Sequence, residues 1–388
     1  MEYSLKVGLF SPYDFAFPSG VNDHILNLHS QLVDKKFKAK IVAPASTKSP
    51  NDHADFIPMG RPVSIPSGGS VARVSLSVWI RPRLWKMMER EQFDIVHIHE
   101  PFASAVTMSA LTFDKPGMKV PTKIATYHSY KGSNLYKLVS NRILQRYAKE
   151  LDGQIAVSKP AKNFIEDHIP ADYKVIPNGI DTDKFSKALP YHIYMDGKIN
   201  ILFVGRIEKR KGLRYLLSAY SDLKWKFPNT RLIIVGKGPL DVESSKIIGE
   251  RNPEDVVFTG AVSEEEKLRY YATANVFCAP ATGQESFGIV LLEAMASSTP
   301  VIASSIEGFS EVVCHNQDSL LFEPRNVEDL KKSLSILIQT PDLRERLVAN
   351  GLHSARKYKW DNVSDKVIDY YHQSSSDNNY SKTLANVI

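Results

Sequence analysis

The chain has 388 residues, of which 43% are hydrophobic, and a formal net charge of +6. A chain of this length can bury large apolar cores and is expected to form two domains of ordinary size. It holds no apolar run of the roughly 18 residues that a membrane-spanning helix needs, and it enters a strand-like run without a signal peptide. We therefore expect a soluble intracellular protein.

Positive charge is concentrated in the first half of the chain. Residues 1–190 hold 25 Lys and Arg against 18 Asp and Glu, whereas the remaining residues hold 24 against 25. Only the first half therefore has an electrostatic reason to approach an anionic surface.

Short apolar runs rich in β-branched residues alternate with helical patterns along the chain. Six runs in the first half indicate one parallel sheet that is buried on both faces: residues 6–10, 40–43, 93–98, 123–127, 154–157 and 174–176. A polar stretch follows, and five further runs predict a second sheet: residues 199–205, 231–236, 256–260, 276–280 and 300–304. The predicted fold class is α/β, with two doubly wound Rossmann-like domains facing each other across a cleft. We place the domains at residues 1–190 and 191–360, followed by a helix and a disordered tail over residues 361–388.

Small or cationic residues follow the predicted strands, where parallel sheets bind their ligands. In the first domain Gly20 immediately precedes a helix, and a backbone without Cβ there can accept a phosphate or sugar, although a lone glycine is more often only a turn. In the second domain Gly205-Arg206 ends a strand and Lys211-Gly212 opens the next helix. Two cations beside a helix N-terminus suit a diphosphate leaving group.

Two carboxylates bracket a later helical segment, Glu285-Ser-Phe-Gly-Ile-Val-Leu-Leu-Glu293. We expect Ser286 to cap this helix and Gly288 to let a ligand approach the backbone. Eight helical residues rise roughly 12 Å, which is about the separation between the sugar and the ribose of an extended nucleotide sugar. N–H groups at the helix start would face the diphosphate. Alternatively, both are ordinary surface glutamates of an amphipathic helix.

Three other patterns favour neither a cofactor nor a metal. Gly236-Lys-Gly238-Pro239 lacks the third glycine of a dinucleotide fingerprint. Asp181 and Asp183 lie in a turn, where a structural role is favoured over a metal site. His97 and His99 share one face of a strand without a third ligand nearby in sequence, so packed strand-end histidines are favoured over zinc.

Four motifs carry a family resemblance: Gly205-Arg206 with Lys211-Gly212, Val235-Gly-Lys-Gly-Pro239, Glu285 with Glu293, and Pro177-Asn-Gly-Ile-Asp181. With them the chain resembles the retaining glycosyltransferases of family four, which have the GT-B fold, over nearly all of residues 5–372. Residues 65–73 and 97–101 look most like the phosphatidylinositol mannosyltransferases. The chain departs from that subgroup at Ser67-Gly68, where a Tyr-Asn pair is usual, and at Ser19-Gly20, where a Gly-Gly pair is usual.

The resemblance implies a role for each candidate residue. Arg206 and Lys211 would neutralise the donor diphosphate, Glu285 would hold the sugar hydroxyls and Glu293 the ribose. His128 would contact the donor sugar; without the family it would be taken for a packed core histidine. Further donor contacts are implied for Gly20, Phe287, Gly288 and Ile289, and acceptor contacts for Ser70 and Arg73. The leaving phosphate can itself take the acceptor proton, so no divalent metal and no cofactor are expected.

A basic amphipathic segment covers residues 74–90, where cations alternate with Trp, Ile, Leu and Met over a helix expected to start near Pro82. This composition suits a helix that lies on an anionic bilayer. The alternative is a core-facing amphipathic helix with a basic outer face. The membrane contacts we predict are Trp79, Arg81, Arg83, Trp85 and Lys86.

These observations predict a retaining glycosyltransferase that moves a hexose, mannose from GDP-mannose, onto a lipid acceptor such as phosphatidylinositol. It would act as a peripheral enzyme on the cytoplasmic face of the cell membrane, with no nucleic-acid partner. One alternative is a UDP-hexose donor with a diacylglycerol or soluble acceptor. Another is a nucleotide-sugar epimerase of the same fold, which would consume its donor without any acceptor.

Overall fold

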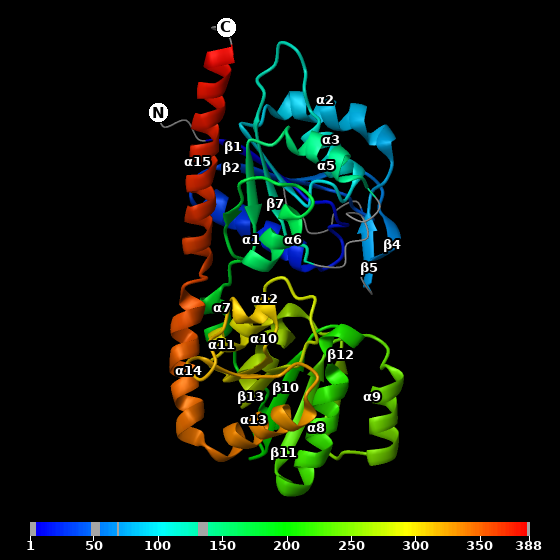
Figure 1. Cartoon of the computed structure of the whole chain (residues 1–388), viewed down its shortest axis with the longest axis vertical. Helices are drawn as coiled ribbons and strands as arrows, with labels where there is room; N and C mark the ends of the chain where they lie inside the picture. Colours follow the sequence, from blue (N-terminus) through cyan, green and yellow to red (C-terminus); the bar gives the residue numbers. More distant parts are fainter. Residues whose placement is uncertain (1–4, 48–54, 68–69, 131–138, 386–388) are drawn as a thin grey trace. The chain divides into compact units, whose positions relative to one another are not determined.

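The computed structural model describes residues 5–47, 55–67, 70–130 and 139–385 (Figure 1). The chain divides into two compact units, which we call the N-terminal unit (Met1–Gly179 with Trp360–Ile388) and the C-terminal unit (Ile180–Lys359). Each is built on a parallel sheet with helices on its faces, so the predicted α/β class with two Rossmann-like sheets is confirmed.

The N-terminal unit contains a parallel sheet in the order β3-β2-β1-β6-β7-β8-β9. Its strands are β1 (Lys6–Phe10), β2 (Lys38–Ala43), β3 (Phe56–Pro58), β6 (Ile95–His99), β7 (Thr122–Tyr127), β8 (Gly153–Ala156) and β9 (Lys174–Val175). Side chains alternate between two cores, because successive residues of a strand point to opposite faces: Phe10 of β1 lies in one core, and Val7 and Leu9 lie in the other. Both faces are therefore buried, as the continuous apolar runs predict.

Helices supply the other half of each core. Helices α1 (Gly20–Asp34) and α15 (Trp360–Ala385) pack on one face, and α2 (Arg81–Glu91), α3 (Ala105–Leu111), α5 (Asn141–Ala148) and α6 (Lys159–Glu166) pack on the other. An antiparallel hairpin of β4 (Val63–Ser67) and β5 (Ser70–Val74) and a short 3₁₀ turn, η1 (Val78–Ile80), precede α2.

The C-terminal helix differs from its prediction. Trp360, Val363, Val367 and Tyr371 recur at helical spacing on α15, and all four are buried in the core of the N-terminal unit, whereas the sequence places Trp360 at the end of the second domain. Helix α15 continues to Ala385, through most of the stretch from Gln373 on for which the sequence predicts a disordered tail. Once a helix is anchored by packing, each added residue extends it at little cost.

The C-terminal unit contains a second parallel sheet in the order β12-β11-β10-β13-β14-β15. Its strands are β10 (Ile199–Val204), β11 (Thr230–Val235), β12 (Val256–Gly260), β13 (Val276–Ala279), β14 (Val301–Ser304) and β15 (Ser319–Phe322). Its helices are α7 (Thr182–Ser186), α8 (Leu213–Lys226), α9 (Val242–Lys246), α10 (Glu264–Thr273), α11 (Ile289–Ala296), α12 (Glu307–Ser310), α13 (Val327–Gln339) and α14 (Pro341–Arg356). Two hydrophobic clusters again cover the two faces of the sheet.

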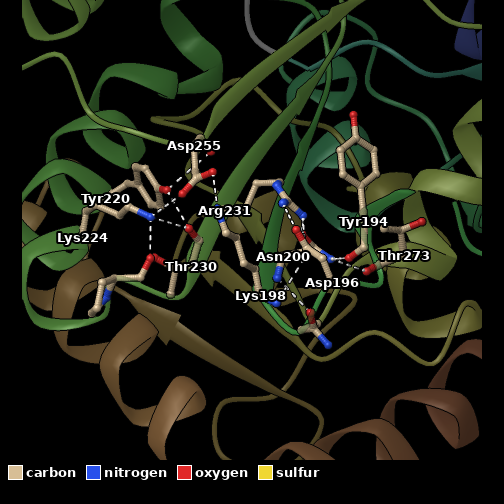
Figure 2. Close-up of polar contacts among 12 residues, drawn as sticks. Tyr194, Asp196, Lys198, Asn200, Tyr220, Lys224, Thr230, Arg231, Asp255 and Thr273 are labelled. Atoms are coloured by element: carbon tan, nitrogen blue, oxygen red, sulfur yellow. Dashed lines mark hydrogen bonds and ion pairs between the residues drawn. The ribbon is translucent and has the colours of Figure 1, made fainter. Parts of the chain in front are cut away.

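A polar network ties the segment before β10 to the amino-terminal edge of this sheet (Figure 2). Arg231 of β11 donates to Asn200 Oδ1 (3.1 Å) and pairs with Asp196. Beside it, Asp255 accepts from Lys198 Nζ (2.6 Å) and Lys224 Nζ (2.7 Å). These contacts hold the polar stretch before β10 within the C-terminal unit.

We predict that Asp255→Asn destabilises the C-terminal unit at neutral pH and much less in acid. The backbone of Asp255 has φ 58°, which asparagine tolerates, so the change removes charge without backbone strain. The hydrogen bonds from Lys198 and Lys224 lower the pKa of Asp255. The ion pairs therefore stabilise the fold above the unfolded-state pKa of about 4, and this contribution is lost as pH falls through the lower folded-state pKa.

Thermal unfolding should show a loss of roughly 1–2 kcal/mol at neutral pH. The matched control is Asp222→Asn, whose more exposed carboxylate pairs with Arg251 and Lys331. A loss that stays constant down to the acid limit would contradict the ionic origin.

Candidate active site

Two glycine turns bring the carboxyl ends of β10 and β11 into direct backbone contact. Gly236 has φ 145°, and a Cβ there would lie 1.9 Å from the carbonyl oxygen of Gly205. A Cβ at Gly238 would lie 2.5 Å from the carbonyl oxygen of Ile207. The Gly-x-Gly pattern is thus required for the packing of two loops, which is a structural reason for it that involves no dinucleotide.

The loop after β10 carries an ionic cluster. Glu208 bridges two arginines: Oε1 accepts from Arg206 Nη1 (2.9 Å) and Oε2 accepts from Arg210 Nε (2.9 Å). On the other side, Glu285 Oε1 is shared by Arg210 Nη1 (2.6 Å) and Lys211 Nζ (2.8 Å). We call these five residues the ionic cluster.

The ionic cluster includes two residues that the sequence reasoning missed, Glu208 and Arg210. Both lie in the short charged run between Arg206 and Lys211, where η3 (Lys209–Lys211) folds the chain back on itself. Gly212 then leads into α8 with φ 72°, and a Cβ there would lie 1.8 Å from the carbonyl oxygen of Pro280. The density of charge in this run was the available signal, but sequence spacing does not show which charges pair.

The segment from Glu285 to Gly288 is held by close backbone packing. A Cβ at Gly308 of α12 would lie 2.0 Å from the carbonyl oxygen of Glu285, and one at Gly288 would lie 2.7 Å from the Phe309 ring. Phe287 is buried beside Tyr358. The expected cap at Ser286 is wrong: Gly288, with φ 94°, is the cap residue, and no side chain caps α11, which begins at Ile289. The first N–H groups of α11 therefore have no side-chain cap of their own.

Glu293 lies on α11 and is nearly buried. Its Oε1 accepts from Lys267 Nζ (2.8 Å), and its Oε2 accepts from the Tyr271 hydroxyl (2.7 Å). Burial alone would lower the pKa of Lys267, but the carboxylates of Glu293 and Glu264 raise it overall. Glu293 is therefore anchored to α10, with one further lone pair on each oxygen for a ligand.

In the N-terminal unit the candidate residues lie at the carboxyl edge of the sheet. Gly20 begins α1 after Ser19, whose side chain caps the helix by accepting from Asn22 N (3.1 Å). A Cβ at Gly20 would have no atom within 4 Å, so this position is open to solvent. His128 follows β7, and its Nε2 lies 3.0 Å from His99 Nδ1. Glu100 Oε1 accepts from the backbone N–H of His128 (2.7 Å) and holds the turn.

The predicted acceptor strand lies beside the loop that follows β1. Arg73 of β5 stacks its guanidinium over the Phe17 ring, 3.9 Å from the centroid, and its carbonyl accepts from Asp14 N (2.8 Å). Ser70 begins the same strand. The loop that leads from β1 to Gly20 therefore lies next to the strand that contains Ser70 and Arg73.

The basic segment forms a core-facing amphipathic helix with a basic outer face, which is one of the two alternatives weighed from the sequence. Helix α2 begins at Arg81, close to the predicted start, and it buries Leu84, Met87 and Met88 in the core. Trp85 is half-buried and donates its Nε1–H to the Ser109 carbonyl (3.0 Å). Exposed on the other side are Trp79, which is 87% exposed, and the three cations Arg81, Arg83 and Lys86. Among the described residues, no helix combines the length and the apolar character needed to cross a membrane.

Comparisons with known proteins decide the family. Residues 193–354 match the family model described as glycosyl transferases group 1, and residues 18–184 match that of glycosyltransferase family 4. The chain is 33% identical to the phosphatidyl-myo-inositol mannosyltransferase of Mycobacterium tuberculosis, over 95% of this chain and 96% of that protein. The chain belongs to the family-four glycosyltransferases. The expected family and its GT-B fold are thereby confirmed, and the enzyme is a nucleotide-sugar-dependent glycosyltransferase.

Other similar proteins have names that describe different activities. The alpha-monoglucosyldiacylglycerol synthase of Streptococcus pneumoniae is 25% identical over 98% of this chain and 88% of its own length. Among solved structures, a sucrose-phosphate synthase from Thermosynechococcus elongatus has a TM-score of 0.73 at 19% identity, covering 95% of this chain and 98% of its own. Anabaena HepE in complex with UDP has a TM-score of 0.72 at 16% identity, covering 95% and 100%. At these identities the solved structures support the fold alone.

The ionic cluster of this glycosyltransferase is suited to an anionic leaving group. Its three cations and two carboxylates leave one net positive charge. Ion pairs with the two carboxylates hold the cations in place. Charges that are already oriented stabilise a developing anion without the cost of reorganisation.

We predict that Glu208→Gln lowers sugar transfer about tenfold, because Arg206 and Arg210 lose the carboxylate that orients them. Steady-state kinetics with the nucleotide-sugar donor should show the loss mainly in kcat. The matched control is Glu243→Gln, which removes a different arginine pair of the same unit, with Arg214. Unchanged kinetics in Glu208→Gln would show that the arginines need no such support.

Proposed function

We propose that this glycosyltransferase transfers mannose from GDP-mannose, with retention of configuration, onto phosphatidylinositol at the cytoplasmic face of the membrane. The observation that carries the proposal is the 33% identity, over 95% of the chain, to a phosphatidyl-myo-inositol mannosyltransferase. The ionic cluster supports it, since breaking the glycosidic bond of a nucleotide sugar places negative charge on a diphosphate.

The proposed roles follow from the chemistry of each side chain. Arg206 and Lys211 neutralise the diphosphate as the bond breaks, and Glu285 exchanges one of its cation contacts for the sugar hydroxyls. Glu293, which is fixed by Lys267 and Tyr271, accepts from the ribose hydroxyls.

Retention places the new bond on the face that the diphosphate leaves. A phosphate oxygen can then take the acceptor proton, and no side chain has to act as the base. His128 contacts the sugar, and Gly20 lets the phosphates approach the start of α1. Donor contacts with Phe287, Gly288 and Ile289 complete the site, and Ser70 and Arg73 hold the acceptor. Since side chains supply the positive charge, catalysis needs no divalent metal.

A second candidate is glucose transfer from UDP-glucose to diacylglycerol, favoured by the similarity to the alpha-monoglucosyldiacylglycerol synthase. The deciding experiment offers radiolabelled GDP-mannose and UDP-glucose to the purified enzyme, each with phosphatidylinositol or diacylglycerol vesicles. Mannosylated phosphatidylinositol supports the proposal. Product only from UDP-glucose and diacylglycerol replaces it with the second candidate.

We predict that Arg206→Ala and Lys211→Ala each reduce mannose transfer by about 10², which corresponds to about 3 kcal/mol of lost charge stabilisation in the transition state. The measurement is the initial rate of lipid mannosylation, with thermal unfolding as the check on folding. The matched control is Lys209→Ala, because Lys209 is exposed and lies in the same loop. A near-normal rate in either variant would contradict the assignment of the diphosphate site.

The exposed face of α2 supports a peripheral membrane location. Arg81, Arg83 and Lys86 project from one helix, next to Trp79 and Val78, which are 87% and 72% exposed. Cations attract anionic headgroups, while an exposed indole enters the interface. We propose that this face, and not the buried Met87 and Met88, docks on the bilayer.

We predict that replacing Arg81, Arg83 and Lys86 together by Ser weakens binding to anionic vesicles by about 10², since each cation near a charged surface contributes about 1 kcal/mol. Sedimentation with phosphatidylserine vesicles at several salt concentrations measures the effect, which salt should screen. A control of equal charge change replaces Lys246, Lys332 and Lys357, which are exposed in the C-terminal unit. Equal losses in both variants would mean that net charge, not this face, governs binding.

A further inference from the structure

Three histidines from distant parts of the chain meet at the carboxyl edge of the N-terminal sheet. His24 comes from α1, His99 ends β6 and His128 follows β7. One ring nitrogen of each lies within 4.8 Å of the other two. The rings are in contact: the His24 centroid lies 5.4 Å from that of His99 and 4.9 Å from that of His128.

Two buried nitrogens of this cluster have no hydrogen-bond partner among the described residues, His24 Nδ1 and His99 Nε2. His99 is fully buried and His24 is 7% exposed. A buried polar atom without a partner costs free energy, and a ligand bound at His24 Nδ1 would recover that cost for His24. Burial lowers the pKa of His24 to about 4 and the pKa values of His99 and His128 well below the usual range.

We propose that His24, His99 and His128 form an inhibitory binding site for Zn²⁺. Zn–N bonds of 2.0–2.1 Å at tetrahedral angles separate two ligand nitrogens by roughly 3.4 Å, so the spacing of the three rings requires only small rotations. His99 Nδ1 and His128 Nε2 already lie 3.0 Å apart and share one proton. Zn²⁺ takes the place of that proton, which moves to the other nitrogen of its own ring, so that both facing nitrogens offer a lone pair to the ion.

The surroundings favour zinc over a hard cation. A set of imidazole nitrogens without carboxylate ligands suits Zn²⁺ far better than Mg²⁺ or Ca²⁺, which prefer oxygen. The Asn178 side chain hydrogen-bonds His24, as partners of metal-bound histidines do. His97 stacks on His99 at 4.4 Å between centroids and is itself fixed by the Tyr371 hydroxyl (2.7 Å) and Thr126 Oγ1 (2.6 Å). Glu100, bonded to the backbone of His128, adds a compensating negative charge at the same turn.

The consequence for activity rests on the proposed function, in which His128 contacts the donor sugar. Zn²⁺ occupies the imidazole nitrogen that this contact needs, so it inhibits, and the inhibition is relieved by high donor concentration. Three protein ligands leave a fourth position on the ion for water. Metal-free enzyme is the active form.

The first test measures metal binding alone. Full-length protein, with any affinity tag removed, is treated with EDTA and freed of chelator, and Zn²⁺ uptake is measured by titration calorimetry and elemental analysis. We expect one equivalent, and Co²⁺ in its place should give the visible absorption of a four-coordinate site. His24→Asn and, separately, His99→Gln should weaken binding more than about tenfold. The control is His372→Asn, an exposed histidine of α15 in the same unit.

Circular dichroism and thermal unfolding test whether each variant is folded. Because the two substitutions lie in different elements, the test still stands if one of the two variants does not fold. Absence of Zn²⁺ uptake by the wild-type protein, or equal uptake by folded His24→Asn and His99→Gln, would overturn the site.

The second test measures inhibition. Mannose transfer by the EDTA-treated enzyme should fall when one equivalent of Zn²⁺ is added, recover with EDTA, and resist Zn²⁺ in His24→Asn. Stoichiometric binding without loss of transfer would overturn the inhibitory role. An enzyme that shows no transfer even when metal-free would instead count against the proposed function, and the binding test, which needs no substrate, would still decide the site.

Discussion

The parallel direction of the strands decides where the candidate site residues of this enzyme lie. Every strand pairing within the two large sheets is parallel, so the carboxyl ends of the strands of each sheet meet at one edge. Arg206 follows β10 and Glu285 follows β13, and they become parts of one ionic cluster although 79 positions separate their numbers. In the other unit, the same constraint places the ends of β1, β6 and β7, with Gly20, His99 and His128, at one edge.

Backbone contact then fixes the loops at these edges. Gly236 lies against the carbonyl of Gly205, and Gly308 lies against the carbonyl of Glu285, so closely that no side chain larger than hydrogen fits at Gly236 or Gly308. Loops held in this way have little freedom to rearrange. The pairing of Glu208 with two arginines has the same effect on the charges. Glycine contacts and ion pairs together thus supply the rigidity that the proposed diphosphate site needs.

The sequence predicted the sheets well because fully buried parallel strands have continuous apolar runs. The structure also brings together Lys211 and Glu285, both named from the motifs, with Lys211 Nζ 2.8 Å from Glu285 Oε1. The sequence could not predict which charges pair. The spacing of Glu208 and Arg210 does not indicate their partners, and only the fold of the loop around η3 shows that they belong to the ionic cluster. The histidine cluster escaped the sequence reasoning because its members come from three segments, and spacing along the chain shows only His97 and His99 as neighbours.

The C-terminal helix shows the same limit at the level of whole elements. The spacing of its apolar residues does not show which core they enter, and the predicted boundary at residue 360 left this helix outside both domains. Trp360 nevertheless packs against Gly179, where a Cβ would lie 2.4 Å from the indole, and Tyr371 reaches His97. The last helix therefore completes the core of the N-terminal unit. The hydroxyl of Tyr371 on this helix also hydrogen-bonds His97. The His97 ring stacks on His99, which in turn hydrogen-bonds His128, so the helix supports the whole histidine cluster.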